Sequence, residues 1–359
     1  MAGGINGRKD TYPAPHEGTE VRTNAEGAGQ RKRRTPMKAA ICSQYGPPDV
    51  VEIKDVEKPV PNDNEVLIRV RAAAVNPLDS HLIKGRAYMG RILFGLRRPK
   101  DTRLGRDVAG QIEVVGRNVI QFKPGDEVFG SCRGAFAEYA CTSESALVMK
   151  PDNMTFEQAA SVPVAAVTAL QGLRDKGKIQ PGQKVLINGA AGGVGTFAVQ
   201  IAKSFGADVT GVCSTRNVDM VRSIGADRAI DYTQEDFTRS GQRYDLIFDL
   251  VSNHSLLACR RVLNPKGIYI AAGILSVRGM IGLLAYLIKP LVLSPFVSQK
   301  LVLFLARLNK EDLTIMRELL ETGKVTPVID RRYRLSEVPE AIRYLEEGHA
   351  RGKVVITVD

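Results

Sequence analysis

The feature that most constrains this chain is a glycine-rich turn between a short apolar strand pattern and a helical segment. Residues 184–188 are mainly apolar, and the sequence Gly-Ala-Ala-Gly-Gly-Val-Gly follows them and opens a helical segment at 193–205. Strand-like and helical segments then alternate as far as residue 271. Because strands that are apolar on both sides need cover on both faces, this alternation predicts an α/β domain with a doubly wound parallel sheet.

The same turn has the spacing of a dinucleotide-binding fingerprint. Its pattern is Ala190-x-Gly192-x-x-Gly195, with alanine in place of the first glycine of G-x-G-x-x-G. We expect Ala190 to fit because it is small, Gly192 to let the backbone approach a pyrophosphate, and the helix N-terminus to face the phosphates. The predicted cofactor contacts in the turn are Ala190, Ala191, Gly192, Gly193, Val194 and Gly195.

The end of the next predicted strand indicates which nucleotide the turn accepts. NAD-binding chains of this type carry an acidic residue about 20 residues further on, where it holds a ribose hydroxyl. Ser214, Thr215 and Arg216 stand at that place instead. A hydroxyl and a guanidinium suit a 2′-phosphate, which a carboxylate would repel, so the sequence favours NADPH. The alternative is that Ser214 and Arg216 belong to a loop that only caps the next helix.

The chain as a whole divides into four parts. Residues 37–163 contain short strand patterns separated by Pro and Gly, which predicts a β-rich, barrel-like domain. Residues 164–309 form the predicted parallel-sheet domain, and residues 310–359 return to the β-rich domain. Residues 1–36 are rich in glycine and poor in large apolar side chains, so we expect a disordered basic tail without a secretory signal.

Charge and cysteine content exclude some classes of protein. The net charge of +11 comes partly from the first 36 residues, and the rest has no long basic block, so we expect no nucleic-acid partner. The five cysteines are odd in number, lie far apart and form no C-x-x-C pair, which favours reduced thiols and a cytoplasmic location.

The ordered set of these features resembles the medium-chain dehydrogenase/reductase superfamily, in its zinc-independent quinone oxidoreductase-like branch. The resemblance covers about residues 37–359 and includes the segments at 75–79, 104–110, 122–128, 134–139 and 224–227. It implies a GroES-like catalytic domain, a Rossmann domain that binds NADPH, a cleft between them, and a homodimer.

The resemblance also shows where a catalytic zinc would be held in the alcohol dehydrogenases of the superfamily. This chain has Asn76 in place of a cysteine there, and Gly105-Arg106-Asp107 in place of Gly-His-Glu. The four-cysteine structural lobe is absent, because residues 126–136 contain only Cys132. A catalytic zinc needs about three protein ligands, and the four histidines supply no such set, with His254 expected to begin a helix. We therefore expect no metal.

Without a metal to polarise a carbonyl, the hydride acceptor must already be electrophilic. Quinones and α,β-unsaturated carbonyls meet this condition, so the predicted function is their NADPH-dependent reduction. One alternative is reduction of an enoyl thioester of CoA or a carrier protein, with a basic mouth formed by Arg97, Arg98 and Lys100. Another is an NADPH-binding scaffold with little turnover, because a Rossmann site alone does not prove catalysis.

Further site residues follow from the resemblance. It places Asn76 beside the nicotinamide, and His81 and Tyr88 on the segment that lines the substrate cleft. Either of the last two could donate a proton or a hydrogen bond, or could be a surface or packing residue. The resemblance assigns cofactor contacts to Thr168, Tyr232, Ala272 and Gly273.

A strongly apolar stretch at 279–306 belongs to none of these features. Charges and prolines interrupt it, so it is too short for a transmembrane helix. Three interpretations stay open: it lines an apolar substrate pocket, it forms a dimer contact, or it lies peripherally on a membrane with Lys289, Lys300 and Arg307 facing lipid phosphates.

Overall fold

The structure is a computed structural model that describes residues 35–85, 98–99, 101–272 and 298–359. Several predicted features lie outside the described residues. They are the tail as far as residue 34, Tyr88, Arg97, Lys100, Gly273 and residues 279–297.

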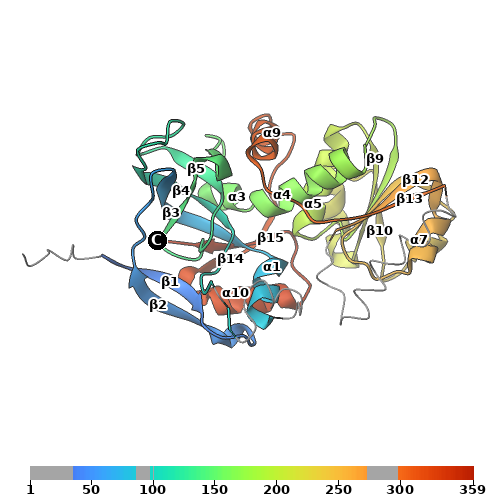
Figure 1. Ribbon diagram of the computed structural model, residues 1–359. Helices are drawn as coiled ribbons and strands as arrows, with labels where there is room; N and C mark the ends of the chain where they lie inside the picture. The colour runs from blue at the N-terminus through green and yellow to red at the C-terminus, as the bar shows by residue number, and fades with distance from the viewer. Residues whose placement is uncertain (1–34, 86–97, 100, 273–297) are drawn as a thin grey trace, which may run out of the picture. The chain divides into compact units, whose positions relative to one another are not determined.

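The glycine-rich turn belongs to a six-stranded parallel sheet (Figure 1). The strand order is β10-β9-β8-β11-β12-β13, in which the direction of winding reverses between β8 and β11. In doubly wound sheets, ligands bind at the carboxyl ends of the strands at such a reversal. The strands are β8 (Lys184–Asn188), β9 (Asp208–Cys213), β10 (Arg228–Asp231), β11 (Tyr244–Asp249), β12 (Leu263–Ala272) and β13 (Lys300–Phe304).

Both faces of this sheet are covered, as the apolar strands predict. Val185 and Ile187 of β8 pack in the same cluster as Phe197 of α5. Leu186 points to the opposite face and packs in a cluster with Cys259 of α7. The helices of this part are α4 (Pro163–Leu170), which continues into a π-helical turn, α5 (Gly193–Ser204), α6 (Val218–Ser223) and α7 (Leu256–Arg261).

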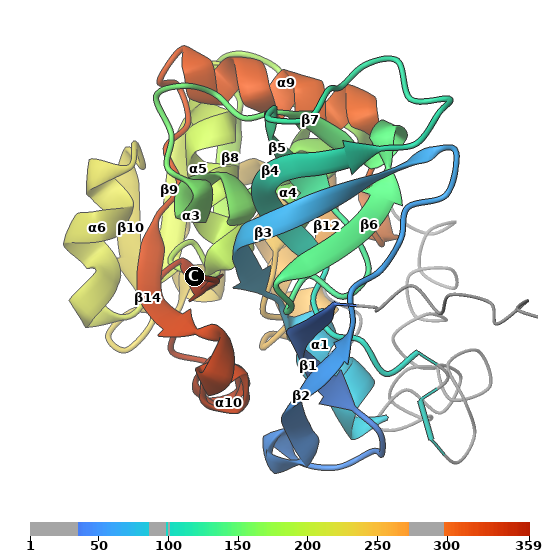
Figure 2. The same cartoon turned by 90° about the vertical axis from the view of Figure 1, so that its left-hand side faces the viewer.

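A second, mostly antiparallel sheet contains the β-rich part of the chain (Figure 2). Its order is β14-β15-β3-β4-β5-β7, with β6 also paired to β3, while β1 and β2 form a separate antiparallel pair. The strands are β1 (Pro36–Cys42), β2 (Val51–Glu57), β3 (Glu65–Val75), β4 (Asp107–Val115), β5 (Glu127–Ser131), β6 (Tyr139–Ser143), β7 (Leu147–Met149), β14 (Ile329–Arg334) and β15 (Lys353–Thr357).

The C-terminal part of the chain completes this second sheet, as predicted. After α9 (Lys310–Glu321), β14 pairs with β15, and α10 (Val338–Glu346) lies between them in sequence. Strand β15 runs antiparallel to β3, with Val354 opposite Val75. This register brings Lys353 to the end of β3, beside Asn76 and the start of α1 (Pro77–Lys84).

Two local predictions were wrong, and one strand was not predicted. Residues 300–304 lie inside the apolar stretch but form β13, which pairs with β12, so Lys300 begins an edge strand. His254 does not begin a helix: α7 starts at Leu256, because the Ser255 hydroxyl accepts a hydrogen bond from Ala258 N at 3.2 Å and caps it. Pro36, assigned to the tail, is the first residue of β1.

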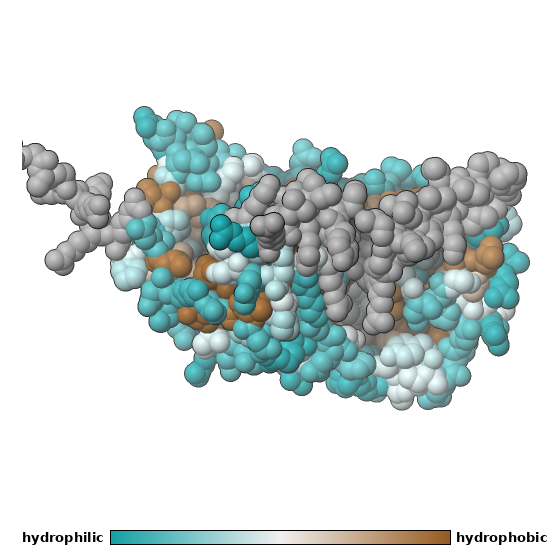
Figure 3. Space-filling view, turned by 60° about the horizontal axis from the view of Figure 1, so that its bottom comes forward, coloured by the Kyte–Doolittle hydropathy of each residue, from teal (hydrophilic) through white to brown (hydrophobic). Residues whose placement is uncertain are grey.

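None of the helices in the described ranges has the length and apolar character that a membrane crossing requires. The face of the molecule in Figure 3 is mostly hydrophilic where described residues are visible, with a few smaller apolar areas.

Candidate dinucleotide and active site

Among the described residues, two cavities border the glycine-rich turn. The first, the dinucleotide cavity, has a volume of about 450 Å³ and lies at the ends of β8, β9 and β11. The second, the Asn76 cavity, has a volume of about 420 Å³ and lies between α1, the turn and the C-terminal return. Gly192, Gly193 and Val194 line both cavities. A ligand on the turn can therefore extend from one cavity into the other.

The last two fingerprint positions need glycine for different reasons. A Cβ on Gly195 would lie 2.0 Å from the carbonyl oxygen of Gly189, so the turn has no room for one. For a Cβ on Gly192, the nearest atom outside its chain neighbours would be the same oxygen, Gly189 O, at 3.5 Å. The fold therefore requires Gly195, whereas Gly192 keeps open space at the first turn of α5, where a phosphate would approach.

Alanine fits at the first fingerprint position because its neighbour is a glycine. Ala190 is fully buried, and its Cβ lies only 2.9 Å from where a Cβ on Gly211 would be. The backbone N–H of Ala190 donates to Val212 O at 3.0 Å, which ties the turn to β9. Ala190 is thus a packing residue of the turn, while Ala191 to Gly195 line the dinucleotide cavity.

The strand end opposite the turn carries hydroxyl and guanidinium groups. Ser214, Arg216 and Tyr232 line the dinucleotide cavity, and no acidic residue is among its described lining. Arg216 reaches the C-terminal return and donates to His349 O at 3.0 Å. Thr215 is not among the described lining residues, and its hydroxyl lies 3.0 Å from that of Thr233. Ser214 stands at the N-cap of the short turn that follows, where its hydroxyl accepts a hydrogen bond from Asn217 Nδ2 at 3.1 Å and none from a backbone N–H of the turn.

A buried carboxylate, missed by the sequence analysis, shapes the far wall of the dinucleotide cavity. Asp249 ends β11, and its Oδ1 accepts hydrogen bonds from Asn188 Nδ2 at 2.9 Å, Val251 N at 3.0 Å and Ser252 N at 2.8 Å. Its Oδ2 accepts from the Tyr269 hydroxyl at 2.7 Å. Asp249 therefore fixes the loop that presents Leu250, Val251 and Asn253 to the cavity.

Three buried polar side chains meet at the base of the Asn76 cavity. Asn76 Nδ2 donates to Asp107 Oδ2 at 2.9 Å, and Lys353 Nζ donates to Asn76 Oδ1 at 2.7 Å. Lys353 Nζ also lies 3.4 Å from Asp107 Oδ2, and both side chains are almost completely buried. Burial raises the pKa of Asp107, against the opposing effects of the Lys353 ammonium, the Asn76 amide and the Val164 N–H.

This cluster also connects the two sheets. Asp107 Oδ1 accepts a hydrogen bond from Val164 N at 3.0 Å, at the beginning of α4. Lys353 lies under the glycine-rich turn, where a Cβ on Gly193 would meet its Cδ at 3.1 Å, and Gly192 forms a bridge with Gly352. The C-terminal strand thus touches the fingerprint directly.

Comparisons with known proteins agree with this arrangement. Residues 62–152 match the alcohol dehydrogenase GroES-like domain family, and residues 224–356 match the zinc-binding dehydrogenase family. The chain is 34% identical over 365 residues to the mitochondrial NAD(P)H oxidoreductase RTN4IP1 of Mus musculus, covering 91% of this chain and 90% of the relative.

Two further proteins match over nearly the same range. The chloroplastic NADPH-dependent alkenal/one oxidoreductase of Arabidopsis thaliana is 34% identical, over 89% of this chain and 79% of the relative. The structure of the quinone oxidoreductase from Coxiella burnetii matches with a TM-score of 0.79 and 31% identity, over 90% of this chain and 100% of that one. The chain belongs to the medium-chain dehydrogenase/reductase superfamily. Within it, the chain falls in the quinone oxidoreductase-like branch, with a GroES-like domain and a Rossmann domain.

Although one matching family of the superfamily is named for zinc, the residues at this place do not fit a zinc ion. Asn76 and Asp107 are bonded to each other, and the Lys353 ammonium lies against both. The neighbouring position holds Arg106, a second cation. Among the described residues no group of three or more His, Cys, Asp or Glu side chains is arranged to hold a metal. A divalent cation would meet positive charge and an incomplete ligand set here.

The other predicted site residues do not all line the two cavities. His81 lines the Asn76 cavity, together with Ser80 and Lys84 of the same helix. Thr168 and Ala272 line neither cavity, and the Thr168 hydroxyl donates to Val164 O at 2.7 Å within its own helix. Tyr88 and Gly273 lie outside the described residues.

The sequence analysis did not find Lys353. Lys353 pairs with Asp107, from which it is separated by 246 residues in sequence. The available signal was a Gly352-Lys353 pair directly before the last apolar strand, in a chain whose C-terminus was already expected to return to the β-rich domain.

Proposed function

We propose that this chain is an NADPH-dependent oxidoreductase that transfers a hydride to a quinone or an α,β-unsaturated carbonyl without zinc. The observation that carries the proposal is the open space over Gly192, at the first turn of α5 and between two cavities. The family and the printed activities of the relatives support the same reaction class.

The proposed cofactor contacts follow from the dinucleotide cavity. The backbone from Ala191 to Gly195 would hold the pyrophosphate, because the N–H groups of the first helical turn have no acceptor within the helix. Ser214 and Arg216 would hold a 2′-phosphate, and Tyr232 would lie near the adenosine. Bound NADPH would supply the hydride from its nicotinamide ring.

In this proposal, Asn76 is a positioning residue and does not donate a proton to the substrate. Its amide nitrogen donates to Asp107 and to Ala74 O, and its oxygen accepts from Lys353, so its polar atoms are occupied inside the protein. The Lys353 side chain lies at the base of the cavity, where a cation favours negative charge developing on an acceptor oxygen. Of the two predicted proton donors, His81 is the one that lies on a described cavity wall.

Other features stay predictions. Reduction of an enoyl thioester is the second candidate, but of the three residues expected at its basic mouth only Arg98 is described, and it is exposed. The scaffold alternative, the homodimer, the membrane contact of the apolar stretch and the cytoplasmic location are untested, and the printed names of relatives include mitochondrial and chloroplastic proteins.

Steady-state oxidation of NADPH and NADH against a quinone, an enone and an enoyl-CoA tests the proposal. We expect turnover with the first two acceptors, a preference for NADPH, and a loss of that preference in Arg216→Gln. Activity should survive dialysis against a chelator. Equal use of NADH by the unmodified protein, or activity that depends on added zinc, would contradict the proposal.

A further inference from the structure

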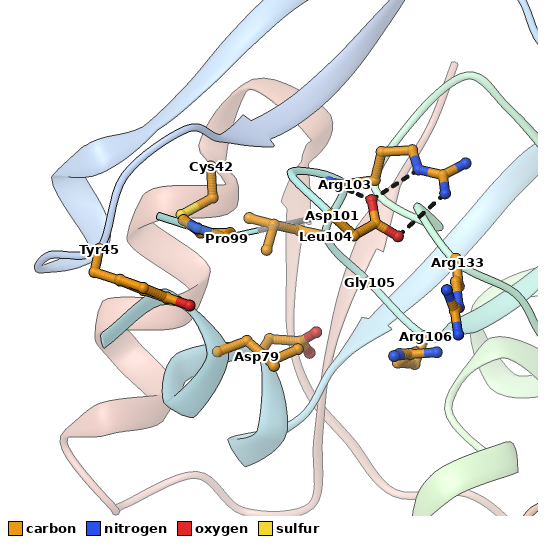
Figure 4. Close-up of a pocket in the computed structure, with 11 residues that line it drawn as sticks. Cys42, Tyr45, Asp79, Pro99, Asp101, Arg103, Leu104, Gly105, Arg106 and Arg133 are labelled. Carbon is orange, nitrogen blue, oxygen red and sulfur yellow. Dashed lines mark hydrogen bonds and ion pairs between the residues drawn. The ribbon is translucent and has the colours of Figure 1, made fainter. Parts of the chain in front are cut away.

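A third cavity, the arginine pocket, lies in the GroES-like domain and shares no described lining residue with the other two (Figure 4). Its volume is about 260 Å³. Its charged lining residues are Asp79, Asp101, Arg103, Arg106 and Arg133.

Asp79 places an unsatisfied oxygen in this pocket. The side chain is fully buried, and its Oδ2 accepts a hydrogen bond from Asn76 N at 2.8 Å. Its Oδ1 is buried as well and has no hydrogen-bond partner among the described residues. In Figure 4 the carboxyl group points toward the side of the pocket where Arg106 lies. A buried polar atom without a partner is costly, so one that faces a cavity indicates a missing ligand.

The arginines of the pocket are not equivalent. Arg103 is held by Asp101 through hydrogen bonds of 2.9 and 3.1 Å. Arg106 is half-buried and Arg133 is exposed, and no hydrogen bond or ion pair to another described residue occupies the guanidinium group of either. The pocket therefore carries two available guanidinium groups.

The protonation of Asp79 decides what the pocket can bind. Burial raises the pKa of Asp79 to about 7, and Asp107 adds to the shift, against the opposing effects of the Asn76 N–H, Lys353 and Arg106. Below that pH the side chain is a neutral acid, and Oδ1 is the oxygen free to carry the proton into the pocket. Two guanidinium groups and one O–H are all donors, so they match an anionic group with acceptor oxygens, such as a carboxylate.

We propose that the arginine pocket binds the carboxylate of a small organic acid through Arg106, Arg133 and Asp79. Because Asp79 is bonded to the backbone of Asn76, the bound acid would lie next to the proposed reduction site. The acid is either one end of the hydride acceptor, a possibility that rests on the proposed function, or a separate ligand.

Calorimetric titration with 4-oxopentanoate tests binding without any turnover. At a pH of about 6 we expect saturable binding that weakens about tenfold in Arg106→Gln and in Arg133→Gln, as for loss of a charge-assisted hydrogen bond. Arg117→Gln is the matched control, since Arg117 is exposed and pairs with Asp63. Asp79→Asn keeps a neutral donor and should keep binding. An unmodified protein that binds no acid, or Arg106→Gln and Arg133→Gln variants that bind like the control, would overturn the proposal.

A turnover assay distinguishes the two sources of the carboxylate. The acceptors are 4-oxopent-2-enoate and its methyl ester, which differ in charge. If the acceptor itself carries the carboxylate, Arg106→Gln lowers the ratio of kcat/KM for acid over ester, and Arg117→Gln does not. If a separate acid is bound, the calorimetric titration shows weaker binding in Arg106→Gln, while the ratio of kcat/KM for acid over ester is unchanged. If neither acceptor is reduced, the proposed function fails, and the calorimetric titration still decides whether the arginine pocket binds a carboxylate.

Discussion

At the scale of single residues, one added methyl group should have opposite consequences at Gly192 and Gly195. Gly192→Ala meets open space, so we expect a melting temperature close to that of the unmodified protein but NADPH binding weaker by about tenfold or more. Gly195→Ala brings a Cβ against Gly189 O and should destabilise the protein by about 1–3 kcal/mol. Calorimetry and thermal melts check both. Unchanged NADPH affinity in Gly192→Ala would refute the role given to the turn.

Asp79 should make the stability of the protein fall as the pH rises. Its pKa is about 7 in the folded state and near 3.8 when unfolded, so the folded state binds the proton more tightly. The resulting stabilisation is fully present below about pH 4 and is lost as the pH rises to about 7; three pKa units correspond to about 4 kcal/mol. Asp107, Lys353 and Arg106 act on the same carboxyl group.

The Asp79→Asn variant isolates this contribution, because asparagine does not titrate in this range. Urea unfolding gives the free energy of unfolding of both proteins between about pH 4.5 and 8. As the pH rises, this free energy should fall in the unmodified protein relative to the variant. A difference that is constant with pH would show that the Asp79 carboxyl is not protonated in the folded protein.

At the scale of secondary-structure elements, β15 is held to β3 and β4 by a buried ion pair as well as by backbone pairing. Lys353→Met removes the ammonium and leaves Asp107 buried without it, which should cost about 3–5 kcal/mol. The double variant Lys353→Met/Asp107→Asn should recover most of this loss, because no unpaired charge is left. Urea unfolding measures both. A double variant as unstable as the sum of the single ones would contradict the explanation.

The elements also show what the sequence could and could not predict. Strand β8 begins and ends at the predicted residues 184–188, because a parallel strand buried on both faces has a local signature. Strand β13 was missed, because prolines and charges in the surrounding apolar stretch hid its short pattern. The pairing of Lys353 with Asn76 and Asp107 depends on the register of β15 against β3, which no local pattern contains.

The site residues show the same difference between local patterns, which were predicted, and long-range contacts, which were not. The turn from Ala191 to Gly195 was predicted from spacing and lines the dinucleotide cavity, as do Ser214 and Arg216. Asp249 was missed, because a buried acid at a strand end resembles any other acid in sequence. The arginine pocket combines α1 with the segment around Arg106 and with Arg133, which are separated by long stretches of chain.

At the scale of the whole molecule, NADPH should stabilise both sheets together. The dinucleotide cavity is lined by Gly192 to Gly195 beside the parallel sheet and by Gly348 to Ala350 of the C-terminal return. The Asp107–Val164 hydrogen bond and the Gly192–Gly352 bridge also connect these parts. A ligand at a hundredfold excess over its Kd adds about 2.7 kcal/mol, which raises Tm by a few degrees for a chain of this size.

We therefore expect one unfolding transition in calorimetry that moves upward as a whole with NADPH, and less with NADH at the same concentration. Arg216→Gln should bring the two nucleotides to the same shift, because it removes the guanidinium proposed to bind the 2′-phosphate. If instead NADPH moved only one of two separate transitions, the nucleotide would be bound by the Rossmann part alone. The contacts of Gly348 to Ala350 with the cavity would then contribute nothing to binding.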